Sequence, residues 1–290
     1  LNDCRKEKLM PDFITRHHYT TELPKTEGHY GYAALSDAEQ GFADLQSTRD
    51  IIDSFDEYRG VEIHLTEFNT SYIPNCPLHD TNQNAAYLAQ QLSRLGDVNE
   101  SYSYWTFGDI FEEQGVPFTP FHGGFGLVAN GCIPKPTFWT FRFYKELCGE
   151  CVHKSDDLVV VHTADGGYQG IAWNAGKERT GRELQFEIAF PAGSTQEYML
   201  LMKTVDEDTC NPLRLWHDMG EPSGLSERQK KLLQDCAKPL ISSRRMKAEE
   251  GKLRISFTEK EFGVVYFEIR PVTANSDRGY DYDRVMRGGA

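Results

Sequence analysis

The sequence predicts an α/β unit followed by an all-β unit. Residues 12–147 repeat a strand pattern and a helix pattern three times, an order that implies parallel strands joined by crossover helices. After residue 150, short strand patterns follow one another with glycine-containing turns between them, as in a sandwich of antiparallel sheets. The 290 residues are 39% hydrophobic, which is enough for a core in each unit. We therefore expect one domain over residues 1–147 and a second over residues 148–290.

The first strand pattern covers Asp12–Thr20 and is followed by a loop over Glu22–Ser36. Alternation along the strand separates two faces, one with Phe13, Thr15 and His17 and the other with Ile14, Arg16 and His18. Residues 37–55 then show a helical pattern. Its apolar stripe consists of Phe42, Leu45, Ile52 and Phe55.

The second strand pattern begins at Val61 and ends in a carboxylate, Glu67. Alternation puts Val61, Ile63, Leu65 and Glu67 on one face. A carboxylate at the end of an apolar row is costly to bury, so it is either paired or used. The polar residues 69–72 follow, which predicts that the strand opens into an irregular loop. A salt-bridged glutamate and a functional one both fit this pattern.

The third strand pattern, Ser101–Phe107, also ends in polar groups. Before it, Asp80 or Thr81 can cap a helix that stops near Gly96. After it come the carboxylates Asp109, Glu112 and Glu113, the glycine-rich loop His122–Gly126, and an aromatic helix over Phe138–Leu147 with Pro136 at its start. Three parallel strands that all end in polar or aromatic groups at one sheet edge favour a functional Glu67, because α/β folds keep their chemistry there.

The second unit contains six strand patterns and one helix pattern. The strands are expected at Leu158–Thr163, Tyr168–Asn174, Leu184–Phe190, Tyr198–Val205, Leu253–Phe257 and Val264–Ile269. A helix over Ser226–Cys236 interrupts them, with Ser226 as its cap. The polar, glycine-rich tail Thr273–Ala290 is expected to be extended or loosely docked.

Charge and cysteine usage exclude several classes of function. The formal net charge of -13 argues against a nucleic-acid partner and against an anionic membrane surface. Seven scattered cysteines favour reduced thiols in a cytoplasmic protein. Cys148 and Cys151 lack both a thioredoxin-like context and further zinc ligands, so we expect no metal and no cofactor. The chain starts at Leu1 rather than at methionine, which suggests a truncated N-terminus.

Carboxylate chemistry on a sugar suits the remaining candidates best. The sequence contains no G-x-S-x-G elbow, which a serine hydrolase would need, and neither of the glycine-rich phosphate-binding motifs. Glycoside hydrolysis needs two carboxylates that flank one sugar. Trp105 and Tyr19 offer flat aromatic surfaces for the apolar face of a sugar, although core packing is an alternative for Trp105.

The chain resembles glycoside hydrolase family 39, the β-xylosidases. The resemblance rests on segments that occur in the family's order: 16–19, 63–72, 79–81, 84–87, 103–107, 111–113, 121–127, 133–138, 171–174, 216–222 and 237–239. It implies the C-terminal part of a (β/α)8 TIM barrel (strands 6 to 8) followed by a β-sandwich, and hydrolysis with retention at terminal β-xylosyl units of xylo-oligosaccharides. It makes Glu67 the nucleophile. It implies sugar contacts from His17, Tyr19, Tyr72, Trp105, Glu112 and Glu113, and a different pocket wall at His18.

The resemblance also shows what this chain does not contain. The family's acid/base glutamate follows an asparagine at the end of barrel strand 4, whereas Asn99-Glu100 precedes a strand. We therefore expect the chain alone to be nearly inactive. An incomplete sheet leaves open edges, which predicts a homo-oligomer. Two alternatives to the enzyme are a sugar-sensing module of a transcription regulator and a scaffolding β-sandwich with a degenerate barrel.

Overall fold

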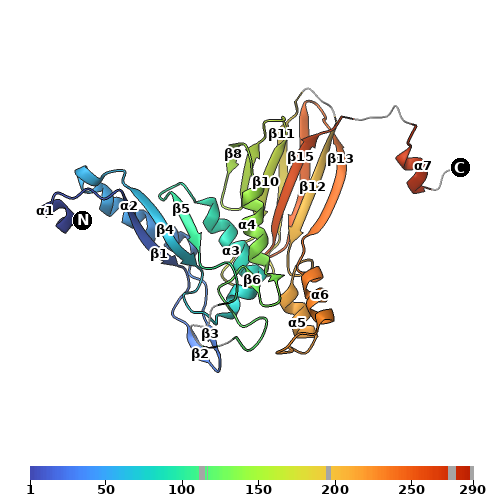
Figure 1. The fold of residues 1–290 in the computed structure, drawn as a ribbon. Helices are drawn as coiled ribbons and strands as arrows, with labels where there is room; N and C mark the ends of the chain where they lie inside the picture. Colours follow the sequence, from blue (N-terminus) through green and yellow to red (C-terminus); the bar gives the residue numbers. More distant parts are fainter. Residues whose placement is uncertain (111–114, 116, 194–196, 274–278, 288–290) are drawn as a thin grey trace.

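The computed structural model describes residues 1–110, 115, 117–193, 197–273 and 279–287. Its first part contains a sheet of three parallel strands in the order β1-β4-β5, as predicted (Figure 1). The strands and longer helices are β1 (Phe13–Tyr19), α2 (Ala38–Asp53), β4 (Glu62–Asn69), α3 (Asn82–Ser93), β5 (Ser101–Tyr104) and α4 (Pro136–Glu146). The shorter elements are α1 (Asn2–Lys6), β2 (Lys25–Glu27), β3 (Tyr30–Tyr32), η1 (Asp56–Tyr58), η2 (Pro77–Asp80), β6 (Val128–Ala129) and β7 (Ile133–Pro134). The three strands do not close a barrel among these residues.

Local sequence signals explain where these helices start. The Asp37 side chain accepts a hydrogen bond from the backbone N–H of Glu39 at the start of α2, and Thr81 accepts one from Asn84 at the start of α3. Pro136 occupies the first turn of α4, where its missing N–H costs nothing. These caps confirm the predicted helices to within a few residues.

The second part has a six-stranded antiparallel sheet and a separate strand pair. The sheet has the order β13-β12-β15-β10-β9-β8, and β11 pairs with β14. The strands are β8 (Glu150–Lys154), β9 (Leu158–His162), β10 (Tyr168–Trp173), β11 (Leu184–Pro191), β12 (Glu197–Val205), β13 (Leu240–Lys247), β14 (Lys252–Glu259) and β15 (Val264–Pro271). The helices are α5 (Pro212–Asp218), α6 (Glu227–Cys236) and α7 (Tyr282–Arg287). In Figure 1, α7 lies apart from the sheets.

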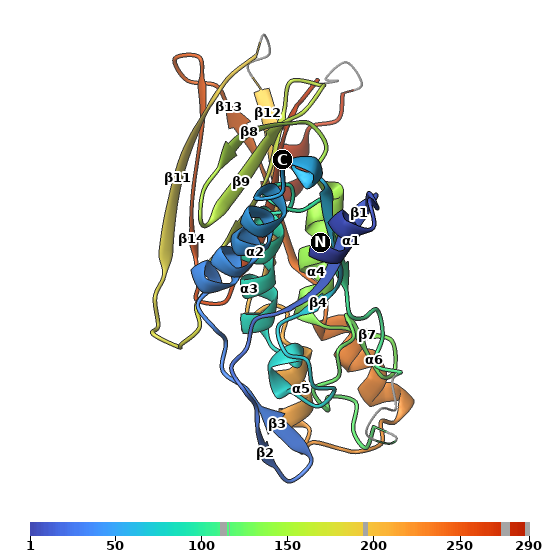
Figure 2. The same cartoon turned by 90° about the vertical axis from the view of Figure 1, so that its left-hand side faces the viewer.

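Two apolar clusters cover the two faces of the six-stranded sheet. Phe186 and Phe190 of β11 pack on one face together with Phe267 of β15, and Figure 2 shows the β11–β14 pair beside β8 and β9. On the other face, Trp173 of β10 shares a buried cluster with Phe143 of α4. The sheet is therefore covered by the strand pair on one side and by helices of the first part on the other. The boundary at residues 147/148 stays a prediction.

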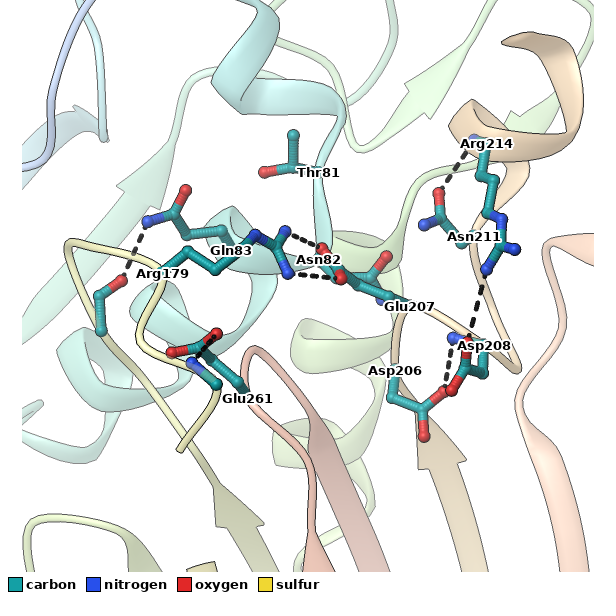
Figure 3. Close-up of polar contacts among 12 residues, drawn as sticks. Thr81, Asn82, Gln83, Arg179, Asp206, Glu207, Asp208, Asn211, Arg214 and Glu261 are labelled. Atoms are coloured by element: carbon teal, nitrogen blue, oxygen red, sulfur yellow. Dashed lines mark hydrogen bonds and ion pairs between the residues drawn. The ribbon is translucent and has the colours of Figure 1, made fainter. Parts of the chain in front are cut away.

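The first turn of α3 is joined to the loops of the second part (Figure 3). The Gln83 side chain donates a hydrogen bond to the carbonyl of Gly176 at 3.0 Å. Nearby, Arg179 pairs with Glu207 at 2.6 Å. The Gln83 hydrogen bond joins α3 to the second part, and the Arg179–Glu207 pair joins two loops of the second part beside it.

The prediction missed several elements. The hairpin β2–β3 lies in the predicted loop 22–36, and the short helix α5 and the strands β8 and β13 were not expected. The third strand is shorter than predicted, because pairing with β4 ends at Tyr104. All residues of β8, and all of β13 except Met246, are exposed, so neither strand shows the apolar alternation that marks a half-buried strand.

Glu259, the last residue of β14, is a buried carboxyl group, and in the described part of the chain its oxygens accept no hydrogen bond. Burial raises the pKa of this carboxyl well above its usual range, and neighbouring Asp206 raises it further. The folded state therefore holds the proton more tightly than the unfolded state does. The stability linked to Glu259 is full below the usual carboxyl pKa and is lost as the pH rises through the folded pKa.

Glu259→Gln is therefore expected to raise the thermal midpoint at pH 8 and to change it less at pH 5, because glutamine stays neutral at both values. Thermal denaturation followed by circular dichroism at each pH measures this difference. The control is Glu187→Gln on the paired strand β11, where the side chain is exposed, and it should shift neither midpoint. An equal shift at both pH values would contradict the assignment of a neutral Glu259.

Candidate active site

A β-bulge decides the direction of Glu67. Arg16 pairs with Leu65, but the next residue, His17, pairs with Glu67, so Thr66 is the extra residue on β4. A bulge shifts the alternation of side chains by one position. Phe68, rather than Glu67, therefore continues the buried row on the helix side, where it packs against α3.

The prediction that Glu67 shares the face of Val61, Ile63 and Leu65 is therefore wrong, because the bulge follows Leu65. Ile63 packs against the α2 side of the sheet, whereas His64 faces Phe13 across the opposite side, with ring centroids 5.3 Å apart. After the bulge, Glu67 follows His64 on this open side. The Glu67 side chain is 23% exposed, so solvent can reach the carboxylate from the open side of the sheet.

Two side chains of β1 meet the Glu67 carboxylate. The Tyr19 hydroxyl donates a short hydrogen bond to Oε1, and His17 Nδ1 lies 3.6 Å from the same oxygen. Both residues belong to the face of β1 that the sequence assigned to Phe13, Thr15 and His17. A hydrogen bond from a hydroxyl group fixes the orientation of the carboxylate that accepts it.

Tyr72 adds an aromatic wall at the same place. Its ring meets the Tyr19 ring edge-to-face, with centroids 6.2 Å apart and an interplanar angle of 76°. Tyr72 is 47% exposed, so much of this ring is open to a ligand. His17, Tyr19, Glu67 and Tyr72 therefore form one cluster at the carboxyl ends of the parallel strands.

Trp105 follows β5 and is tied to the β4 strand through backbone contacts. Its N–H donates to the carbonyl of Phe68 at 3.0 Å. The buried Asn69 side chain donates to the carbonyl of Trp105 at 2.6 Å. Trp105 is partly buried. It lies one residue past the Phe68–Tyr104 pair, at the same edge of the sheet as Glu67.

Three further predictions have different outcomes. Glu112 and Glu113 lie outside the described residues. His18 faces α2, where its ring packs near Gly41, so the expected change in the pocket wall is wrong. Burial, together with the charge of Arg16, lowers the pKa of His18 to about 4, and this histidine is therefore neutral near pH 7.

The sequence reasoning assigned no role to one buried group beside the site. Lys135 lies between the carboxylates of Asp80 and Asp109 and is fully buried. A lysine inside an aromatic and proline-rich segment is the only sequence signal for it. Among the residues that the structure describes, no group of three or more His, Cys, Asp or Glu side chains forms a metal site, and no helix is long and apolar enough to cross a membrane.

Comparisons with known proteins identify the class. The chain is 35% identical over 283 residues to a β-xylosidase of Geobacillus stearothermophilus, covering 94% of this chain and 54% of that protein. It is 29% identical to a β-xylosidase of Caldicellulosiruptor saccharolyticus, covering 78% of this chain and 47% of that one. The chain therefore spans about half the length of the curated relatives it matches. Both relatives carry the name β-xylosidase, which is a glycoside hydrolase activity.

The family follows from a match to a family model. The model of the glycosyl hydrolases family 39 covers residues 1–254, and the chain belongs to this family. The solved structure of a family 39 enzyme from Xanthomonas axonopodis pv. citri superposes with a TM-score of 0.83 at 24% identity, over 93% of this chain and 56% of that one. A monomeric β-xylosidase from Caulobacter crescentus gives a TM-score of 0.80 at 24% identity, over 94% and 58%. These two structures agree with the fold.

Proposed function

We propose that this chain carries the nucleophile of a retaining β-xylosidase, with Glu67 in that role. The observation that supports the proposal most directly is the cluster of Tyr19, His17 and Tyr72 around an accessible Glu67 carboxylate at the strand ends. Xylo-oligosaccharides with terminal β-xylosyl units are the proposed substrates, with Trp105, Glu112 and Glu113 among the sugar contacts. The relatives named above are hydrolases, and nothing favours the regulator alternative.

The proposed mechanism has two displacement steps. The Glu67 carboxylate attacks the anomeric carbon, the bond to the leaving oxygen breaks, and an acid/base carboxyl group protonates that oxygen. Water then attacks the same carbon and releases Glu67, while the acid/base group accepts the proton from water. The Tyr19 hydroxyl orients Glu67 throughout. We place the acid/base glutamate upstream, in the part of its relatives' length that this chain does not span, and a protein that includes this part is called the full-length form.

The finer architecture belongs to the same proposal. We assign β1, β4 and β5 to strands 6 to 8 of a (β/α)8 barrel, and the two sheets of the second part to a β-sandwich, with domains over residues 1–147 and 148–290. The scattered cysteines, all of them free, support a cytoplasmic location. The open edges of the three-stranded sheet support a homo-oligomer.

A covalent trap tests the role of Glu67. A 2-fluoro-xyloside with a good leaving group should leave a fluoroxylosyl group on Glu67 of the full-length form. The fluorine slows both steps, and the good leaving group speeds the first step alone, so the covalent intermediate accumulates. Peptide mass spectrometry locates the modified residue, and Glu67→Gln should remain unlabelled. A label on another carboxylate would contradict the assignment.

A further inference from the structure

Lys135 is a buried cation between two carboxylates. Its Nζ lies 2.6 Å from Asp80 Oδ1 and 2.7 Å from Asp109 Oδ2, and it donates a hydrogen bond to the carbonyl of Gly124 at 2.8 Å. Burial acts to lower the pKa of Lys135, but the two carboxylates outweigh it and the pKa is raised. Lys135 is therefore charged, and a buried charge of this kind persists only when its partners are in place.

The three charged residues come from three different connections. Asp80 ends η2 after the β4 loop, Asp109 follows β5, and Lys135 precedes α4. The second oxygen of each carboxylate accepts a hydrogen bond from a backbone N–H of the loop 122–126. Asp80 Oδ2 accepts from the backbone N–H of Gly123 at 2.8 Å, and Asp109 Oδ1 accepts from that of Gly126 at 2.6 Å.

The loop 122–126 fits tightly against these carboxylates. A Cβ on Gly124 would lie 2.4 Å from Asp109 Oδ1, and one on Gly123 would lie 2.4 Å from the backbone of Cys76. Side chains at these two positions would push the loop away from its anchors. The glycines that the sequence shows here therefore permit close approach of the backbone to the charged group.

The same loop contacts the residues of the candidate active site. The carbonyl of Phe125 accepts hydrogen bonds from the Asn69 side chain at 3.3 Å and from the backbone N–H of Thr106 at 3.2 Å. Asn69 also holds the carbonyl of Trp105 and lies two residues after Glu67. A continuous series of contacts thus runs from Lys135 through the loop to both Trp105 and the end of β4.

We propose that Lys135 is a positioning residue of the active site, which holds the loop 122–126 and the Trp105 segment in register with the strand that bears Glu67. It does so through Asp80 and Asp109 and makes no contact with the sugar. The inference rests on the proposed function, since it concerns the shape of that same site.

Charge balance distinguishes this role from general packing. Lys135→Met leaves two buried carboxylates without a counter-ion, and such a pair gains protons when the pH falls. The loop should then be displaced at pH 8 and return toward its wild-type position at pH 5, as the pair takes up protons. The other titratable groups that face the cluster are His79, Tyr104, Tyr30, Cys76 and His122.

Most of these neighbours keep one charge state between pH 5 and pH 8. Burial lowers the pKa of His79 to about 4, so that this ring is neutral. Burial raises the pKa values of Tyr104, Tyr30 and Cys76, so that they stay protonated. His122 is replaced by glutamine in a parallel pH series, so that any pH dependence that remains belongs to the other groups.

The experiment uses this chain, four variants (His122→Gln among them) and two readouts. Amide hydrogen exchange of peptides over residues 103–110 and 121–127 reports the loop, and titration with a xylose-configured iminosugar, a cation that pairs with Glu67, reports the site. For Lys135→Met we expect faster exchange and about tenfold weaker binding at pH 8, both reversed at pH 5. The double variant Lys135→Met/Asp109→Asn has one buried carboxylate fewer, so its amide exchange and iminosugar binding at pH 8 should return toward the wild-type values. The control Lys145→Met, on the exposed side of α4, should match the wild type.

Several results would overturn the proposal. Unchanged exchange and binding in Lys135→Met at pH 8 would do so, and so would losses that are the same at pH 5 and pH 8 and persist in the double variant. The second outcome includes a variant that fails to fold under every condition. Absence of iminosugar binding to the wild type would instead contradict the proposed function, while the exchange readout would still decide the role of Lys135.

Discussion

Glu67→Ala in the full-length form is expected to lower kcat on the order of 10⁶-fold, as removal of a covalent nucleophile does in other enzymes. In the proposed mechanism the carboxylate forms the bond to the anomeric carbon in the first step, and no other described carboxylate shares its cluster with Tyr19 and His17. KM should change much less than kcat, because the proposed sugar contacts of Tyr72 and Trp105 remain. Steady-state hydrolysis of an alkyl xyloside measures both constants.

The matched control for this variant is Glu62→Ala, five residues earlier on β4. The Glu62 side chain is exposed, so its loss should leave kcat within about twofold, the usual scale for surface substitutions. Azide offers a second check, since a small anion can enter the space that alanine leaves. It should restore part of the rate in Glu67→Ala and yield the xylosyl azide of inverted configuration. Full activity without azide would contradict the role of Glu67.

The sequence placed Glu67 near the end of a strand, as the structure does, but it did not predict the direction of the side chain. Strict alternation placed the carboxylate on the buried row with Ile63 and Leu65, and the bulge at Thr66 moves it to the open side. Neither glycine nor proline marks this bulge. It arises from pairing with β1, which is a contact between residues nearly fifty positions apart, so local sequence carries no signal for it.

The same limit applies to the buried cluster around Lys135. Caps such as Thr81 and Pro136 act within one turn of helix and were predictable from their neighbours. The ion pairs of Lys135 join residues 80, 109 and 135, which come together only when three connections pack at one sheet edge. Edge strands β8 and β13 were missed for another reason, because their exposed residues lack apolar alternation.

This chain alone is expected to hydrolyse xylobiose about 10²–10⁴-fold more slowly than the full-length form, which is the usual contribution of a general acid. The reason is that Glu67 can attack, but the described residues offer no second carboxylate beside it to protonate the leaving oxygen. A nitrophenyl xyloside needs little such help, since its leaving group departs as a stable anion. The deficit should therefore be smaller on that substrate.

The comparison of the two substrates separates a missing acid from a misfolded site. If the Glu67 site forms in this chain, the ratio of nitrophenyl xyloside to xylobiose turnover should be higher for the chain than for the full-length form, and Glu67→Gln should abolish both reactions. A site that does not form would show equal losses on both substrates. Rapid xylobiose turnover by the chain alone would mean that the acid lies within residues 1–290, with Glu112 and Glu113, which follow Trp105 in sequence, as the first candidates to replace.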